Sequence, residues 1–231
     1  MKKILKKILP EILLRWYRNN AVAKYKRLKT KEVFTDIYIN NHWKSRKSIS
    51  GVGSEIEQTR SLIAELEKLI NDMNIKSILD IPCGDFTWMK MVDLTGIKYT
   101  GADIVDDLIK NNTELYGKDT GRKFIVMDLI TEPLPENELL IVRDCLVHLS
   151  FNDAKAAIEN IRTSGCRYLL TTTFPGYRSN YDITTGGWRR LNLNKEPFCF
   201  PDPILIINEN CTEEYGNFRD KSMALWEISK L

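Results

Sequence analysis

The chain has 231 residues, 43% of them hydrophobic and 28% charged, which suits one ordinary globular domain with an extension. No apolar run approaches the length needed to span a bilayer. The sequence holds only two histidines, and its five cysteines show no C-x-x-C spacing, so we expect no zinc site and assign no metal ligand, while a cation bound by Asp144 and a later residue stays open. The odd number of cysteines favours a reduced, cytoplasmic protein.

The net charge of +3 conceals an uneven distribution along the chain. Residues 1–31 carry +10, which leaves −7 for residues 32–231. Apolar pairs recur there every four residues (Ile4-Leu5, Ile8-Leu9, Ile12-Leu13, Trp16-Tyr17), a pattern that predicts a basic amphipathic helix interrupted or bent at Pro10. Such a helix suits an anionic membrane surface, and it suits equally well a docking site on this chain or on a partner. We therefore expect an extension over 1–31 and one domain over 32–231.

Residues 32–53 have no clear periodicity, and we expect irregular structure there. Ser54 and Glu57 form the pattern of a capping box, which predicts a helix from this point to about Asn74. Beyond it, apolar runs predict strands near 77–81, 98–104, 123–129, 138–144, 168–173, 204–208 and 223–228. Helices are expected from about Phe86, near 106–116, and from about Asn152. The alternation predicts a doubly wound, Rossmann-like α/β sheet of seven mostly parallel strands with an antiparallel terminal hairpin.

Three successive predicted strands each end in an acid. Asp80 precedes the tight turn Ile81-Pro82-Cys83-Gly84, Asp103 ends the second strand, and Asp128 ends the third. Because parallel strands end at the same edge of a sheet, these carboxylates should lie where α/β folds bind ligands. Asp103 lies nineteen residues beyond Gly84, a separation that suits an acid binding ribose hydroxyls.

The turn at Gly84 limits which nucleotide could bind. It lacks the G-x-G-x-x-G of dinucleotide sites, and no Walker loop occurs, so a ligand with a ribose and no phosphate fits better. On these residues the chain resembles class I S-adenosylmethionine (SAM)-dependent methyltransferases. Asp80-Ile-Pro-Cys-Gly84 resembles their D-x-G-x-G motif with proline at the first glycine. The resemblance covers about residues 55–231. It implies that SAM, and the product S-adenosylhomocysteine, bind to Asp80, Pro82, Cys83, Gly84, Asp103, Ile104, Met127, Asp128, Leu129 and Arg143.

Methyl transfer to a hydroxyl needs a base that removes the proton of the acceptor. Strand four of this fold ends beside the sulfonium, where the sequence reads Arg143-Asp144-Cys145-Leu146-Val147-His148. His148 is the candidate general base, because an unperturbed imidazole titrates near neutrality. Asp144 would orient the imidazole or act as a second base. A capping or core role for His148 is the alternative. The [DN]-P-P-[YFW] sequence typical of amino-group methylation is absent.

The segment after strand five, residues 174–193, is long, polar and aromatic. Aromatic faces beside directional polar groups are typical of carbohydrate sites, so we expect acceptor contacts from Tyr181, Asp182, Trp188, Arg189 and Asn192. An insertion that covers SAM without touching the acceptor is the alternative. With R-D-C-L-V-H-L-S and G-G-W-R-R-L-N-L, the chain resembles small bacterial and viral methyltransferases of glycan assembly. That resemblance implies O-methylation of a sugar hydroxyl in a surface polysaccharide or glycolipid precursor.

Other functions remain open from the sequence. A small-molecule (natural-product) O-methyltransferase should have a more apolar acceptor pocket, and a non-catalytic SAM-binding subunit could scaffold a glycosyltransferase partner. A nucleic-acid partner is not expected, because the body of the chain is acidic. The expected location is the cytoplasm, with peripheral attachment at the inner face of the membrane if residues 1–31 bind lipid.

Overall fold

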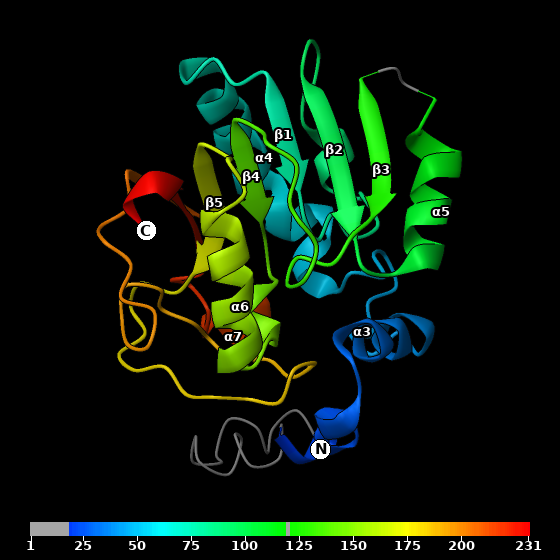
Figure 1. Cartoon of the computed structure of the whole chain (residues 1–231), viewed down its shortest axis with the longest axis vertical. Coiled ribbons are helices and arrows are strands. Elements are labelled where there is room, and N and C mark those ends of the chain that lie inside the picture. Colours follow the sequence, from blue (N-terminus) through cyan, green and yellow to red (C-terminus); the bar gives the residue numbers. More distant parts are fainter. Residues whose placement is uncertain (1–18, 119–120) are drawn as a thin grey trace.

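The computed structural model describes residues 19–118 and 121–231, which form an α/β fold around one seven-stranded sheet (Figure 1). The strands lie in the order β3-β2-β1-β4-β5-β7-β6. All pair in parallel except β7, which is antiparallel to β5 and β6. Their bounds are β1 Ser77–Asp80, β2 Lys98–Asp103, β3 Arg122–Val126, β4 Leu139–Val142, β5 Tyr168–Thr173, β6 Leu205–Asn208 and β7 Ser222–Glu227.

The helices cover both faces of this sheet. On one face α6 (Phe151–Arg162) packs against Leu140 and Val142 of β4, and on the other α4 (Ile56–Asp72) and α5 (Asp106–Tyr116) pack with Leu139 and Ile141. Successive residues of a strand point to opposite faces, so this single apolar strand serves both cores. The short helix α7 (Glu213–Gly216) lies between β6 and β7 in the chain. The predicted fold class is confirmed.

The predicted helix from Phe86 is wrong. Phe86 has a left-handed backbone (φ +58°), which ends any helix there, and only a short 3₁₀ turn, Met89–Met91, follows. Its fully buried ring packs on Tyr99, Tyr116 and Phe124. Burial of this ring therefore decides the local conformation.

The predicted capping box is also wrong. Ser54 belongs to a 3₁₀ turn (Val52–Ser54), Glu55 is the residue that precedes α4, and no side chain caps this helix. The Glu57 carboxylate is instead paired with Lys47. The Glu57 side chain is therefore in an ion pair and does not make the backbone hydrogen bond that a capping box requires.

Residues 32–53 were expected to be irregular, but α3 (Thr30–Ile39) occupies their first part. Only Val33 and Ile37 of this helix are buried, one turn apart, while Ile39 is 67% exposed, so the apolar signal is weak. We call residues 19–54 the N-terminal segment. In Figure 1 this segment, drawn in blue, lies beyond the arrowheads of β2 and β3, at the carboxyl edge of the sheet.

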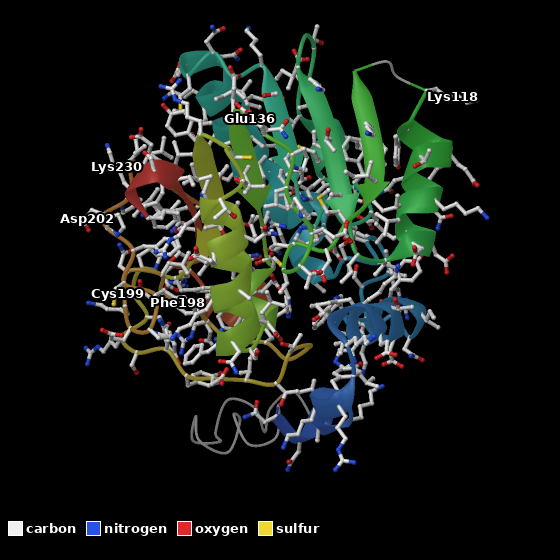
Figure 2. The ribbon with its side chains drawn as sticks, viewed as in Figure 1. Lys118, Glu136, Phe198, Cys199, Asp202 and Lys230 are labelled. Carbon is white, nitrogen blue, oxygen red and sulfur yellow. The ribbon has the colours of Figure 1, made fainter. Side chains whose placement is uncertain are left out.

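The amphipathic pattern of residues 1–18 lies outside the described residues, so only the rest of the predicted extension is seen. There a 3₁₀ helix (Ala23–Arg27) buries Tyr25, which packs with Val22, Val33 and Ile37. Within the described ranges no helix is both long and apolar enough to cross a membrane. The five cysteines form no disulfide, and Cys199, labelled in Figure 2, is exposed.

Candidate active site

A cavity of about 530 Å³ opens at the carboxyl edge of the sheet. Residues that follow β1, β2, β3 and β4 line it, together with much of the N-terminal segment and a few residues near α7. This is the position at which open α/β sheets bind ligands, and the volume falls in the range of about 300–1,000 Å³ usual for small-molecule sites.

The turn after β1 forms one wall of the cavity, which Pro82, Cys83 and Gly84, predicted to bind the cofactor, line. Gly84 has a left-handed backbone (φ +57°), and its amide donates to Asp103 Oδ2 at 3.2 Å. Its carbonyl accepts from Asn112 Nδ2 at 2.7 Å. A Cβ at Gly84 would overlap the Ser50 hydroxyl, so both the conformation and the close approach require glycine.

Asp103 and Ile104 line the cavity beside this turn. The Asp103 carboxylate accepts backbone N–H bonds from Gly84 and from Val105 (3.1 Å), which fix its position. Burial raises its pKa to about 6, although those bonds oppose the shift. Each oxygen retains a lone pair, so the carboxylate can accept hydrogen bonds from hydroxyl groups of a ligand.

Asp80, predicted as a ligand contact, lies beneath the turn and does not line the cavity. Its Oδ2 accepts from the Tyr99 hydroxyl at 2.7 Å, and burial raises its pKa to about 7. Asp80 therefore supports the turn from below.

The residues after β3 complete this end of the cavity. Met127, Asp128 and Leu129, which the sequence predicts to bind the cofactor, line the cavity. The Asp128 carboxylate accepts from the Ile130 amide at 2.9 Å and from the Thr131 hydroxyl at 2.8 Å, which fixes its orientation.

His148 lines the same cavity from the short 3₁₀ turn Leu146–His148. Its Nδ1 lies 2.7 Å from the Gly187 carbonyl oxygen, and its ring centroid lies 4.5 Å from that of Trp43. A carbonyl oxygen can only accept, so Nδ1 carries the proton and Nε2 the lone pair. Burial lowers the pKa of His148 to about 4, whereas the sequence predicted a value near neutrality.

Asp144 does not orient His148 by a hydrogen bond, contrary to one reading of the sequence. Its Oδ2 accepts from Lys221 Nζ at 2.6 Å and lies 3.5 Å from Arg143 Nη1. Burial alone would raise the pKa of Asp144, but the two cations outweigh burial and lower it to about 2. The carboxylate is thus ionised and held by cations, while the Gly187 carbonyl orients the imidazole.

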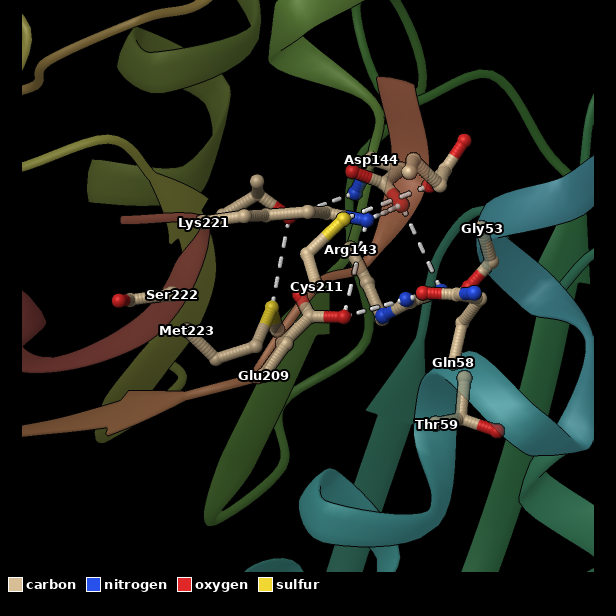
Figure 3. A network of polar contacts seen from close by, with 12 residues as sticks. Gly53, Gln58, Thr59, Arg143, Asp144, Glu209, Cys211, Lys221, Ser222 and Met223 are labelled. Atoms are coloured by element: carbon tan, nitrogen blue, oxygen red, sulfur yellow. Dashed lines mark hydrogen bonds and ion pairs between the residues drawn. The ribbon is translucent and has the colours of Figure 1, made fainter. Parts of the chain in front are cut away.

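Arg143, predicted to contact the cofactor, lines the cavity but uses its guanidinium in a buried network (Figure 3). Nη2 donates to the Gly53 carbonyl at 2.7 Å and pairs with Glu209, which also lies 3.6 Å from Lys221. Burial opposes the charge of Lys221, but Asp144 and Glu209 raise its pKa. Two cations and two anions therefore compensate one another behind the cavity.

The segment after β5 contributes less to the cavity than predicted. Trp188 lines it, but Tyr181, Asp182, Arg189 and Asn192 do not. Asp182 accepts from the Phe151 and Ile183 amides, and Asn192 donates to the Pro175 and Tyr177 carbonyls. Arg189 is fully buried and donates to the Leu149 carbonyl. These polar groups satisfy the backbone of an ordered loop, so composition alone overestimated their availability to an acceptor.

Sequence reasoning missed the contribution of the N-terminal segment. Phe34, Trp43 and residues 49–54 line the cavity, as do Phe218 and Lys221 near the C-terminus. The only available signals were Trp43 among polar residues and the Gly51-Val52-Gly53 turn. Within the described residues, no group of three metal-ligating side chains is clustered.

No family model and no curated protein matches the chain. Solved structures do. One is magnesium protoporphyrin IX methyltransferase (ChlM) from Synechocystis PCC 6803 with bound SAM, with a TM-score of 0.60, 15% identity, and coverage of 86% of this chain and 96% of that one. Human N-acetylserotonin methyltransferase (ASMT) in complex with SAM has a TM-score of 0.58 and 16% identity, with coverage of 92% of this chain and 66% of that one. PigF with SAH has a TM-score of 0.54 and 14% identity, with coverage of 74% of this chain and 56% of that one. The chain therefore has the fold of class I SAM-dependent methyltransferases.

Proposed function

We propose that the chain is a SAM-dependent O-methyltransferase. The observation that carries this proposal is that one cavity joins the Asp103 carboxylate to the His148 imidazole. The first can bind a ribose and the second can accept a proton. The fold is that of proteins solved with SAM or SAH.

The residues at the Asp103 end fit SAM. The turn with one glycine, the fixed carboxylate and the apolar Ile104, Met127 and Leu129 suit a ribose and an adenine without a phosphate. When bound, SAM supplies an electrophilic methyl group. Asp103 would accept from the ribose hydroxyls, and the walls formed by residues 82–84 and 127–129 would hold the adenosine.

At the other end of the cavity His148 would remove the acceptor proton. Nδ1 donates to the Gly187 carbonyl, so Nε2 is the nitrogen available as a base. Deprotonation makes the hydroxyl oxygen a better nucleophile as it attacks the methyl group. The N-terminal segment, which forms one wall, would exclude water and keep the acceptor in line.

The acceptor that we propose is a sugar hydroxyl of a surface polysaccharide or glycolipid precursor. The Trp43 and Trp188 rings offer flat faces for the C–H side of a sugar, and the Asp144 and Glu213 carboxylates offer acceptors for its hydroxyls. The surface-glycan reading otherwise rests on the resemblance of the sequence motifs.

A small-molecule acceptor is the second candidate, and the aromatic side chains that line the cavity support it. Phe34, Phe174 and Phe218 join the two indoles, which makes the acceptor end richer in aromatic rings than the sequence suggested. Such a lining also suits a planar phenol.

A turnover assay separates the candidates. Purified protein with SAM would be presented with nucleotide sugars, short oligosaccharides and simple phenols, and S-adenosylhomocysteine release would be measured. Turnover on saccharides supports the first candidate, and turnover on phenols alone supports the second. Absence of SAM binding by calorimetry would contradict both.

We also propose that residues 1–31 attach the enzyme to an anionic membrane, where lipid-linked glycans are assembled, or to a glycosyltransferase there. Their charge of +10 supports this assignment. Because Val22 and Tyr25 pack within the fold, a charge change is a better test than a deletion. Replacement of Lys2, Lys3, Lys6 and Lys7 by glutamate should abolish salt-sensitive co-sedimentation with anionic vesicles. Equal binding of the native protein and this variant to anionic vesicles would contradict membrane attachment.

A further inference from the structure

His148 is held from two sides by segments that are far apart in the sequence. The Gly187 carbonyl oxygen lies 2.7 Å from Nδ1, and the centroid of the Trp43 indole lies 4.5 Å from that of the imidazole. The two rings are tilted by 43°, and both line the cavity. Trp43 has a second ring contact, edge-on with His42 at 5.3 Å.

The two holding segments also contact each other. Gly186 has a φ of +91°, and a Cβ there would lie 2.6 Å from Val33 Cγ1 and 2.7 Å from Tyr25 Cδ2. The Gly187 side of the imidazole is therefore packed directly on the N-terminal segment that carries Trp43. We call this contact of Gly186 with Tyr25 and Val33 the seam.

We propose that Trp43 is a positioning residue for the proposed reaction. Its indole and the Gly187 carbonyl hold the His148 imidazole between them, which leaves Nε2 to accept the proton of the acceptor. The inference rests on the proposed function. It gives the N-terminal segment a role in proton removal that no motif in its sequence indicates. A cavity wall alone would not require a ring in contact with the imidazole.

Three effects on His148 can be separated. Burial is the main reason for its low pKa, the Gly187 carbonyl opposes that shift, and the nearby charged groups are Asp144, Lys221 and Arg189. None of these groups belongs to the N-terminal segment. Loss of the indole should thus admit water to the imidazole while leaving the charges unchanged.

The test is a proton NMR titration of the full chain, which has only two histidines. A His42→Gln variant assigns the two imidazole signals. In the native protein His148 should not titrate between about pH 5 and pH 8. In Trp43→Leu its pKa should rise toward the ordinary value, by about one pH unit or more, and Trp43→Phe should restore most of the native behaviour.

Trp188→Leu is the matched control for Trp43→Leu. It also removes an indole from the cavity wall, but that ring packs on Phe174 and Phe218. An unchanged His148 titration in Trp43→Leu, or an equal shift in Trp188→Leu, would overturn the proposal. SAM calorimetry on the same variants should show unchanged affinity, and failure of the native protein to bind SAM would instead contradict the proposed function.

If Trp43→Leu does not fold, the native protein still provides a test. Nuclear Overhauser effects between the Trp43 indole and the His148 ring protons, with ¹⁵N shifts that place the proton on Nδ1, support the arrangement. Their absence, or the opposite tautomer, overturns it.

Discussion

The Ser50 hydroxyl accepts a hydrogen bond from the Asp85 amide at 2.9 Å, and the Asp85 carboxylate in return accepts from the Ile49 amide at 2.9 Å. This reciprocal pair attaches the N-terminal segment to the turn that follows β1. The wall over the cavity and the turn that would bind the cofactor are thus parts of one hydrogen-bonded unit. Loss of the Ser50–Asp85 hydrogen bond should therefore affect ligand binding at the turn.

Asp103→Asn should weaken SAM binding. The amide has nearly the same shape but lacks the charge, and bonds to a charged group contribute about 1.5–3 kcal/mol each. Isothermal calorimetry measures the loss. Unchanged affinity would remove Asp103 from the role of ribose acceptor.

The affinity for SAM should depend on pH through the same carboxyl. Burial raises the pKa of Asp103 to about 6, so the ionised form that accepts ribose hydroxyls is lost as the pH falls through that value. Affinity should therefore rise between about pH 5 and pH 7 in the native protein and stay flatter in Asp103→Asn. A native profile as flat as that of the variant would contradict this linkage.

His148→Ala should lower kcat by about 10²–10⁴-fold and leave SAM affinity nearly unchanged, because a general base acts on the acceptor. Since burial lowers the pKa of His148 to about 4, the base should stay unprotonated down to that pH, and only below it should the rate fall on its account. Single-turnover rates against pH measure both effects. Near-native turnover in the variant would transfer the role to another group.

Glu209→Ala should destabilise the fold by about 3–5 kcal/mol, because it removes the carboxylate paired with Nη2 of the buried Arg143 and leaves only Asp144, at 3.5 Å from Nη1. Urea unfolding provides the measurement. The control is Glu57→Ala, which removes an exposed partner of Lys47 and should hardly change the midpoint. Similar midpoints for the two variants would show that the buried pair contributes little.

Gly186→Ala should loosen the seam, since its Cβ would overlap Val33 and Tyr25 while the backbone stays left-handed. Gly96→Ala is a matched control, because Gly96 also has a positive φ (+75°) but nothing lies within 4 Å of its added Cβ. Limited proteolysis should cleave residues 19–54 faster in Gly186→Ala alone. Equal cleavage in the two variants would mean that backbone strain, not the contact, is responsible.

The sheet could be predicted because its central strands, such as β4, β5 and β7, are buried on both faces. Tyr168–Thr173 matches its predicted bounds, and Leu205–Asn208 and Ser222–Glu227 differ from theirs by a residue. Long apolar runs report burial directly. The conformation at Phe86 could not be predicted, because three rings from other elements determine it.

Some residues of the candidate site could likewise be predicted from the sequence, and others could not. Residues that end strands, such as Asp103 and Asp128, line the cavity because topology alone brings strand ends together. Asp182 and Asn192 have the composition of a binding loop, yet their side chains bond to backbone groups of that loop. Trp43 and Lys221 were missed because only tertiary packing brings them to His148 and Asp144.

The contacts of the N-terminal segment also bear on the order of events during synthesis. Residues 19–54 leave the ribosome before any of their partners, and those partners extend from Asp85 through Arg143 to Gly186. Pairings so distant along the chain form slowly and late, because a long loop must close before they stabilise anything. The bonds to Asp85 can form before the contact with Gly186, and the cavity acquires its final wall only after residue 186 has been made. Tyr25, Val33 and Ile37 can pack on one another before that point, so the late step joins a small apolar cluster to the rest of the fold.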